Sequence, residues 1–591
     1  MKQRKLFLIL SVVLIASMFL AACGTKTPAT EAPVATEAPA ATEAPAATAE
    51  PTAAPTPAHP LVEGAVSADG LMSLVAPDCE YGTEDSPAKL KSIEAVDPYT
   101  VKFTLCAPDP AFPSKVAFSV FSIQDSDYLD ANSGDSMAMS EAPNGTGPYK
   151  IVAWNRGDSV VYEANDNYWG EPALSKNLIF RWSEQSAQRL LELQAGTVKG
   201  IDNIGPDDVA TVEADNTLKM YPRNGFNIFY IGLNNTIAPF DQLEIRQALA
   251  YAIDRQRIVD QFYPTGSSVS DSFVPAFVTP GASPDIKWYE YDPAKAQELL
   301  ATAGYDASNP LEITLSFRVV DRAYLPYPDK VAQEIQAQLK EVGVEVTLEE
   351  MESAAFIDAT AAGQKGFYML GWNADYPDAT NFYDYHFATA ANLQNGDLYP
   401  DLVSEINAAA QLSDPAARQA HYDTVNQLIK DYVVTIPVAN GGSATAFQAN
   451  VEGAHSSPLG NERFSVMSNG TDQIVWMQNA EPNSLWCADE TDGETLRACE
   501  QAYESLLGFS VGGTDIEPAL AESYEANDDL TEWTFKLREG VTFHNGATFE
   551  ANDVVASYVA LWDSASPNHV GRTGSFEYFN SFFGAFLNVG W

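Results

Sequence analysis

Several short stretches of the chain alternate between apolar and polar residues with a period of two. Such alternation predicts β-strands that bury one face. The apolar positions of three of these stretches are Val101, Phe103 and Leu105; Trp533, Phe535 and Leu537; and Val344, Val346 and Leu348. The sequence therefore predicts sheets built from half-buried strands.

Other stretches place apolar residues three or four positions apart, which predicts helices with one buried face. Pro328 should open such a helix and Gly343 should close it. The apolar face of this helix would consist of Val331, Ile335, Leu339 and Val342. Earlier in the chain, Asp241 and Glu244 predict an N-cap and its partner. The apolar positions that follow them are Leu249, Ala252, Ile253 and Ile258. Because helix, glycine and strand follow one another, we expect α/β domains rather than a sandwich or a bundle.

The composition excludes several classes of protein. The chain has 591 residues, a length that corresponds to about four domains. Of these residues, 46% are hydrophobic and 11% aromatic, which excludes disorder across the whole chain. It carries 33 Lys+Arg and 80 Asp+Glu, a net charge of −47. Such acidity repels phosphate backbones and excludes nucleic-acid binding. Five cysteines and six histidines leave little room for a metal enzyme.

The first 23 residues have the pattern of an export signal. A basic start containing Lys2, Arg4 and Lys5 precedes the apolar run 6–20, which is short for a membrane-spanning anchor, the alternative interpretation. Leu-Ala-Ala-Cys-Gly at 20–24 resembles a bacterial lipobox. That resemblance implies cleavage before Cys23, a lipid on its sulfur and a location on the outer face of the cytoplasmic membrane.

Residues 24–59 consist almost entirely of Ala, Thr, Pro and Glu. Such a segment cannot bury a core and stays extended, so it is predicted to act as a tether. A wall-spanning or mucin-like stalk is the alternative.

The other four cysteines are Cys79, Cys106, Cys487 and Cys499. In an oxidising compartment they can pair in three ways. The shortest loops favour Cys79 with Cys106 and Cys487 with Cys499. Zinc binding is the alternative, although the chain has neither a CxxC nor an HExxH motif.

Four segments resemble the family 5 extracellular solute-binding proteins of ABC importers, which include dipeptide- and oligopeptide-binding proteins. They are GTGPYKIVAWNRGDSVVYEANDNYWG at 145–170, FNIFYIGLNN…IRQALAYAIDRQRIV at 226–259, GWNADYPDATNF at 371–382 and the stretch 518–558, which begins PALAESYEANDDL. The resemblance implies a two-lobed periplasmic-binding-protein (Venus-flytrap) fold with a hinge and an extra subdomain. It also implies a receptor that encloses a ligand and catalyses no reaction.

The order of these segments differs from that of the family. The part similar to 473–588 comes first in the family, and the part similar to 89–465 follows it. We therefore interpret the chain as a circular permutant whose family termini are joined near 464–471, at Ser-Asn-Gly. The aromatic C-terminal run of the chain favours the same interpretation. A misassembled or truncated tandem gene is the alternative.

The resemblance also implies a division into domains. The extra subdomain would combine 60–149 with 516–591. Lobe 1 would combine 150–225 with 441–515. Lobe 2 would be the continuous segment 226–440.

Three residues match ligand-binding positions of the family. Asp375 matches the residue that binds the amino group of the ligand, and Arg322 matches the arginine that meets the carboxylate of dipeptides. Trp372 matches a cleft tryptophan. Without the motif, a lone Asp would be a cap, Arg322 a surface charge and Trp372 a core residue. Three further aromatic residues, for which a core or interface role is also open, could stack on sugar rings: Tyr376, Tyr383 and Tyr385.

The resulting hypothesis is a lipid-anchored, monomeric receptor that captures small peptides and delivers them to an ABC permease. We expect no cofactor and no metal site. Enzymatic interpretations lack support because neither a GxSxG nor a GxxxxGK[ST] motif is present. Two alternatives remain, namely an oligosaccharide receptor of the same fold and a structural surface lipoprotein that binds no ligand.

Overall fold

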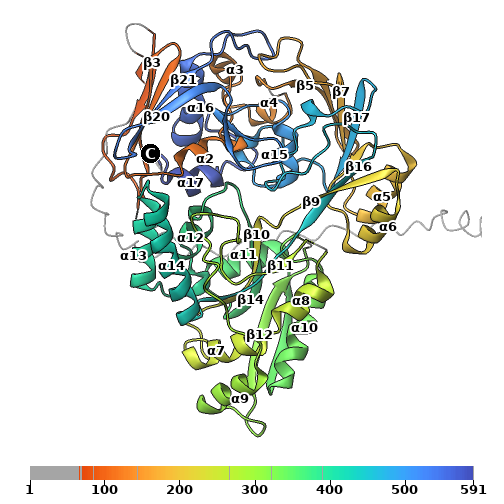
Figure 1. Cartoon of the computed structure of the whole chain (residues 1–591). Coiled ribbons are helices and arrows are strands. Elements are labelled where there is room, and N and C mark those ends of the chain that lie inside the picture. The colour runs from red at the N-terminus through yellow and green to blue at the C-terminus, as the bar shows by residue number, and fades with distance from the viewer. Residues whose placement is uncertain are drawn as a thin grey trace, which may run out of the picture. The chain divides into compact units, whose positions relative to one another are not determined.

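The computed structural model describes residues 65–66, 70–83, 86–142, 144–264, 266–320, 322–388 and 391–589. The predicted lipid-attachment residue Cys23 and the predicted tether lie outside this part of the chain. Within the described residues, no helix has both the length and the apolar character needed to cross a membrane. The backbone forms three large sheets and one small one, with helices packed around them (Figure 1).

The first sheet brings together segments from the beginning and the end of the described chain. In spatial order its strands are β1 (Ala65–Val66), β2 (Met72–Val75), β3 (Leu90–Asp97), β4 (Thr100–Leu105), β21 (Glu532–Leu537) and β20 (Ala521–Ala526). All neighbouring strands are antiparallel. Trp533 lies opposite Phe103, and both are buried. The two alternating stretches predicted as strands are therefore confirmed, and they pair with each other.

Helix α15 (Gly493–Cys499) and five other helices contribute buried residues to the same core as the first sheet. The other five are α2 (Phe112–Val116), α3 (Ser126–Ala131), α4 (Ser136–Glu141), α16 (Ala551–Trp562) and α17 (Glu577–Phe583). Beyond α17, Gly584 forms an antiparallel bridge with Ala88. The last described segment of the chain therefore lies against the start of the first sheet.

The second sheet has seven strands. They are, in spatial order, β5 (Tyr149–Asn155), β6 (Ser159–Ala164), β7 (Asn177–Trp182), β17 (Gln473–Gln478), β8 (Gly200–Ile201), β16 (Ser443–Gln448) and β9 (Leu218–Arg223). Its helices are α5 (Ser186–Ala195) and α6 (Val209–Ala214). Strand β17 runs parallel to β7 and β8, and it begins just after the predicted turn, where Asn469 accepts hydrogen bonds from Thr471. Helix α15 (Gly493–Cys499) and the small sheet of β18 (Leu507–Phe509) and β19 (Ile516–Pro518) follow β17.

The third sheet is built from one continuous part of the chain. In spatial order it contains β11 (Ser268–Val269), β15 (Thr435–Asn440), β10 (Asn227–Leu233), β14 (Phe367–Asn373), β12 (Leu311–Arg318) and β13 (Val344–Met351). Its helices are α7 (Leu243–Ala252), α8 (Arg255–Phe262), α9 (Pro293–Thr302), α10 (Pro328–Glu341), α11 (Ser353–Ala361), α12 (Thr380–Phe387), α13 (Pro400–Ala410) and α14 (Pro415–Tyr432). The step from α10 through Gly343 to β13 confirms the α/β prediction.

The predicted helix that follows Asp241 needs correction. Its N-cap residue is Gln242, and the helix ends at Ala252 instead of continuing past Ile258. The chain breaks because Asp254 starts a second helix, α8, by accepting a hydrogen bond from the backbone N–H of Arg257. The side chain of Gln338 on α10 accepts from the backbone N–H of Asp254 at 2.7 Å. This tertiary contact fixes the break.

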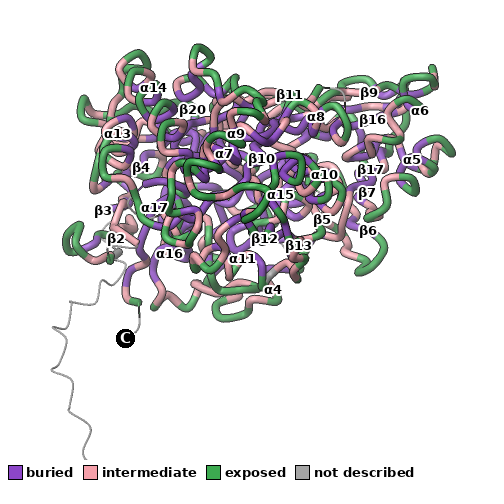
Figure 2. Tube along the Cα trace, turned by 90° about the horizontal axis from the view of Figure 1, so that it is seen from below, coloured by how far each residue is buried: buried purple, intermediate pink, exposed green. Residues whose placement is uncertain are grey.

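Figure 2 colours the buried residues purple. The apolar ones among them form separate clusters. One lies within residues 226–439, around the third sheet. A second combines residues 74–139 with 486–587, around the first sheet. Two further clusters surround the second sheet. Tyr376 is an exception, because it follows β14 of the third sheet but belongs to the cluster of the first sheet.

Two neighbouring segments connect the third sheet to the second: the one between β9 and β10, and the one between β15 and β16. Asn227 ties them together, since its amide donates to the Gly441 carbonyl and its Oδ1 accepts from the Gly441 N–H, both at 2.8 Å. Gly225 must lack a side chain here, because a Cβ would lie 2.7 Å from the Gly441 carbonyl oxygen. This close pair of segments has the form of a hinge.

The four described cysteines form two disulfides. Cys79 is joined to Cys106 and Cys487 to Cys499, with Cα–Cα distances of 5.6 and 6.0 Å. These are the two pairs that are nearest in sequence. In the described part of the chain, no group of three or more His, Cys, Asp or Glu residues is arranged to hold a metal ion.

Candidate ligand-binding site

The loop between β14 and α12 lies at the boundary between the third sheet and the first. Asp378 fixes this loop by accepting two hydrogen bonds from Arg418 of α14, both at 2.8 Å. Burial raises the pKa of Asp378, but the buried Arg418 guanidinium outweighs it and holds that pKa below its ordinary value. The ring of Tyr376 packs edge-on against Phe582 of α17, with 4.9 Å between centroids.

Asp375 extends from this rigid loop and accepts hydrogen bonds only from neutral groups. The amide of Asn381 donates to Oδ2 at 2.9 Å, and the hydroxyl of Tyr578 donates to Oδ1 at 2.7 Å. Burial raises the pKa of Asp375 to about 6, although both hydrogen bonds lower it. No ion pair joins Asp375 to another described residue. The carboxylate is thus held in place without a compensating cation.

Trp372 lies close to Asp375 through a shared partner. Oδ1 of Asn381 accepts from the Trp372 indole at 3.1 Å and from the Asp375 N–H at 3.0 Å. The indole stacks on Tyr385, with ring centroids 4.6 Å apart. Of the three tyrosines singled out in the sequence, Tyr376 and Tyr383 are buried and Tyr385 is 39% exposed. The three tyrosines therefore do not share one exposed surface.

Arg322 lies elsewhere, as an exposed residue of a turn closed by a bridge with the buried Leu325. The neighbouring carbonyl of Ala323 faces the hinge, since a Cβ on Gly441 would lie only 1.8 Å from it. Arg322 lines neither of the two cavities described below. The structure thus brings together Asp375 and Trp372, but it leaves Arg322 outside the cavity of Asp375.

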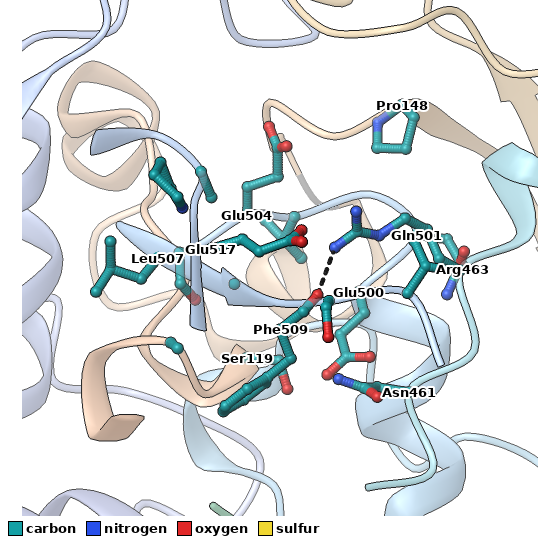
Figure 3. A pocket seen from close by; sticks show the side chains of 18 of the residues that line it. Ser119, Pro148, Asn461, Arg463, Glu500, Gln501, Glu504, Leu507, Phe509 and Glu517 are labelled. Carbon is teal, nitrogen blue, oxygen red and sulfur yellow. Dashed lines mark hydrogen bonds between the residues drawn. The ribbon is translucent and has the colours of Figure 1, made fainter. Parts of the chain in front are cut away.

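The cavity beside Asp375, here named the anchor cavity, has a volume of about 40 Å³. Nine of its ten lining residues come from outside residues 226–440: Phe118, Leu459, Gly460, Asn461, Gly493, Leu496, Arg497, Glu500 and Phe509. A larger cavity of about 140 Å³, the side cavity, shares Asn461, Glu500 and Phe509 with it (Figure 3). The two cavities therefore adjoin.

Arg497, which lines the anchor cavity, belongs to a buried quartet of charges. Arg497 lies 3.0 Å from Asp202 and 2.8 Å from Glu462, and Arg223 pairs with the same two carboxylates. Burial raises the pKa of Glu462. The two arginines favour its ionised form more strongly, so this pKa lies below its ordinary value. The quartet has no net charge. Nη1 of Arg497 has no hydrogen-bond partner among the described residues.

Sequence reasoning missed Tyr578, Arg497 and Glu500. Tyr578 is 203 positions from Asp375 along the chain, and it lies beyond the motif at 518–558 although within the family-like part 473–588. A tyrosine in an aromatic run carries no sequence signal for a bond to a distant carboxylate. Its role follows only from the pairing of distant segments.

A comparison with protein families supplies the context for this geometry. The model of the bacterial extracellular solute-binding proteins, family 5, matches residues 40–394 and 515–577, together more than half of the chain. The chain belongs to this family. Its members are solute-binding proteins rather than enzymes, and they act outside the cytoplasm.

Known members resemble this solute-binding protein over much of their length. A dipeptide-binding protein of Pseudomonas aeruginosa is 30% identical over 383 residues, 64% of this chain and 71% of the relative. Heme-binding protein A of Haemophilus influenzae is 29% identical over 65% of this chain and 70% of its own. Among solved structures, HbpA2 of Haemophilus parasuis superimposes with a TM-score of 0.58 at 31% identity, covering 65% of this chain and 76% of that one. The fold prediction of a two-lobed α/β binding protein is confirmed.

Proposed function

We propose that this solute-binding protein is a lipid-anchored receptor that captures peptides between its two lobes and delivers them to an ABC permease. The observation that carries the proposal is the carboxylate of Asp375, which, among the described residues, only neutral donors hold at the lobe boundary. The α-ammonium of a peptide would supply the missing charge. The names of relatives support the same ligand class, since several are dipeptide- or di/tripeptide-binding proteins.

Binding at Asp375 would require the ligand to compete with Tyr578. An ammonium group offers three N–H donors and a charge, whereas the tyrosine hydroxyl offers one neutral donor. Charge-assisted hydrogen bonds are roughly twice as strong as neutral ones. The exchange is therefore favourable for a cationic group and unfavourable for a neutral sugar hydroxyl. Trp372 would lie against the bound peptide. Arg322 would meet the carboxylate of the peptide once the lobes move relative to each other.

Attachment to the membrane is part of the proposal. The lipobox-like segment ending at Cys23 would supply the anchor, and residues 24–59 would hold the binding lobes away from the membrane surface. A single acyl chain binds membranes only marginally, so more than one chain is needed. Ligand binding would favour the closed arrangement of the lobes by its higher affinity for that state.

We further assign the segment order to a circular permutation. Three features support it: the family match is split between 40–394 and 515–577, β21 pairs with β4, and Gly584 bridges to Ala88. We assign lobe 2 to 226–440, lobe 1 to 150–225 with 441–515, and the extra subdomain to 60–149 with 516–591. The core clusters support lobe 2, whereas the buried apolar residues of 486–509 share a core with the extra subdomain.

The test uses the full chain, expressed in a lipidating bacterium and purified in detergent. Calorimetric titration with Ala-Ala and with maltotriose should detect binding of the dipeptide only. Asp375→Ala should weaken dipeptide binding at least tenfold, while the matched variant Asp358→Ala, at an exposed carboxylate of α11, should not. Mass spectrometry of Cys23 should detect the lipid. Binding of maltotriose that is unaffected by Asp375→Ala would overturn the peptide assignment.

A further inference from the structure

The side cavity is large enough for one amino-acid side chain. Its volume of about 140 Å³ is close to that of engineered protein cavities of roughly 150 Å³ that bind benzene. A lysine side chain, counted from Cβ to Nζ, has five heavy atoms, and benzene has six. Because the side cavity adjoins the anchor cavity at Glu500 and Phe509, a ligand held at Asp375 can extend a side chain into it.

The lining of the side cavity is acidic, and most of its charges are already satisfied. Glu462 belongs to the buried quartet. Glu504 accepts hydrogen bonds from Thr146, Tyr168 and Trp169, at 2.8 to 2.9 Å. Arg463 is exposed and donates to the backbone carbonyl of Phe509 at 2.9 Å (Figure 3).

Glu500 is the carboxylate common to both cavities. No ion pair within 4 Å joins it to a described residue. Burial raises the pKa of Glu500 to about 7, while the Ser119 hydroxyl and the charge of Arg497 lower it. Arg497, whose charge acts on Glu500, is already engaged by Asp202 and Glu462.

A second, independent feature points to a ligand at the same place. Arg497 lines the anchor cavity, is only 4% exposed, and its Nη1 lacks a partner among the described residues. Leaving a buried donor unsatisfied costs about 1–3 kcal/mol. A peptide carbonyl oxygen would satisfy it. The arginine cannot swing away to find another acceptor, because Asp202 and Glu462 hold its other nitrogens.

We propose that the site selects peptides whose first residue carries a basic side chain, with Glu500 as the residue that determines this preference. The α-ammonium binds Asp375, the first carbonyl accepts from Nη1 of Arg497, and the side-chain cation enters the side cavity to meet Glu500. The inference rests on the proposed peptide-binding function. It adds a ligand class and a specificity-determining residue to that function.

The experiment compares two dipeptides that differ in a single charge. The full chain in detergent is titrated at pH 8 with Lys-Ala and with norleucine-Ala, whose first side chain is close in length but neutral. The Kd for Lys-Ala should be at least tenfold lower. Glu500→Gln should abolish this ratio. Glu522→Gln, at an exposed residue of β20 that lines neither cavity, should preserve it, and thermal unfolding verifies that both variants fold.

The outcomes separate the two levels of the proposal. Equal affinities for the two dipeptides, both weakened by Asp375→Ala, would overturn the basic-residue preference and leave peptide binding intact. A preference for Lys-Ala that persists in Glu500→Gln would overturn the role of Glu500. If neither dipeptide binds, both the preference and the proposed function are wrong.

Discussion

The hydroxyl of Tyr578 donates a hydrogen bond to Oδ1 of Asp375 across a distance of 2.7 Å. Tyr578 belongs to α17, in the core of the first sheet, whereas Asp375 follows β14 of the third sheet. The hinge at Asn227 and Gly441 connects the third sheet to the second and not directly to the first. This hydrogen bond therefore joins two parts of the protein at the position where the ligand is proposed to bind.

The buried carboxylate should make Asp375→Asn more stable than the natural protein at neutral pH. The pKa of Asp375 is raised to about 6 in the folded state, so the folded protein binds more protons than the unfolded one and its stability falls as the pH rises towards 6. A shift of roughly two pKa units corresponds to about 3 kcal/mol. Urea unfolding should show a gain of up to about 3 kcal/mol at pH 7.5 and almost none at pH 3.5.

The control for this measurement is Asp358→Asn, at an exposed carboxylate, which should change stability little at either pH. A loss of stability for Asp375→Asn at pH 7.5 would contradict the prediction.

Removal of the Tyr578 hydroxyl should weaken the contact between the two parts. In Tyr578→Phe, Oδ1 of Asp375 loses its donor, so the ligand-free protein should spend more time with its lobes apart. Small-angle X-ray scattering should detect a larger radius of gyration than in the natural protein. Tyr385→Phe is the control, because Asn392, the partner of Tyr385, belongs to the same lobe. An unchanged radius in Tyr578→Phe would mean that other contacts hold the lobes together.

Local patterns in the sequence predicted the elements well, because strand alternation and helix caps depend on neighbouring residues. The strands around Phe103 and Trp533 and the helix opened by Pro328 were all correct. The break at Asp254 was missed because Gln338, 84 positions away, helps to fix it. The pairing of β4 with β21 joins residues that are still further apart along the chain. It could be expected only from the family resemblance.

The same distinction applies to the site. The motif around Trp372 and Asp375 marked two residues that lie together in the structure. Glu500 and Tyr578 come from segments that meet this loop only after folding. Their roles depend on burial and on the charges that surround them, and neither quantity can be read from residue spacing.

The hinge should not tolerate a side chain at position 441. In Gly441→Ala the new Cβ would lie 1.8 Å from the Ala323 carbonyl oxygen, so the backbone must move. Steric insertions of this kind cost about 1–3 kcal/mol, and we expect a lower Tm together with weaker Ala-Ala binding. Gly493→Ala is the matched control, since its Cβ would meet no atom within 4 Å. Equal Tm values for the two variants would argue against a tightly packed hinge.

The buried quartet should make the protein sensitive to loss of a single charge. Asp202→Asn leaves Arg223 and Arg497 with one carboxylate between them, and breaking such a buried pair costs about 3–5 kcal/mol. The arginines lower the pKa of Asp202 although burial raises it. Its contribution is therefore present above the ordinary Asp pKa and is lost as the pH falls through the lower, folded-state pKa.

Urea unfolding of Asp202→Asn at pH 7 and at pH 3 should detect this dependence as a smaller difference from the natural protein at the lower pH. The control is Asp158→Asn, at an exposed pair with Arg181 separated by 3.7 Å. Such surface pairs contribute about 0–1 kcal/mol. A large effect in the control, or none in Asp202→Asn, would contradict the assignment of the quartet.

The proposed permutation predicts that the chain can be cut and rejoined without loss of the fold. A rearranged gene would begin at Thr471, connect Asn588 to the segment before Ala88 by a short linker, and end at Asn469. Because Gly584 already bridges to Ala88, the linker has only a short distance to span, and we expect a Tm within a few degrees of the natural protein and unchanged Ala-Ala binding. A chain ending at residue 472 should instead fail to fold, since it lacks β21 and leaves the buried face of Phe103 uncovered. If that truncated chain folds and binds Ala-Ala, the segment beyond residue 472 is not part of the same domain set and the permutation is wrong.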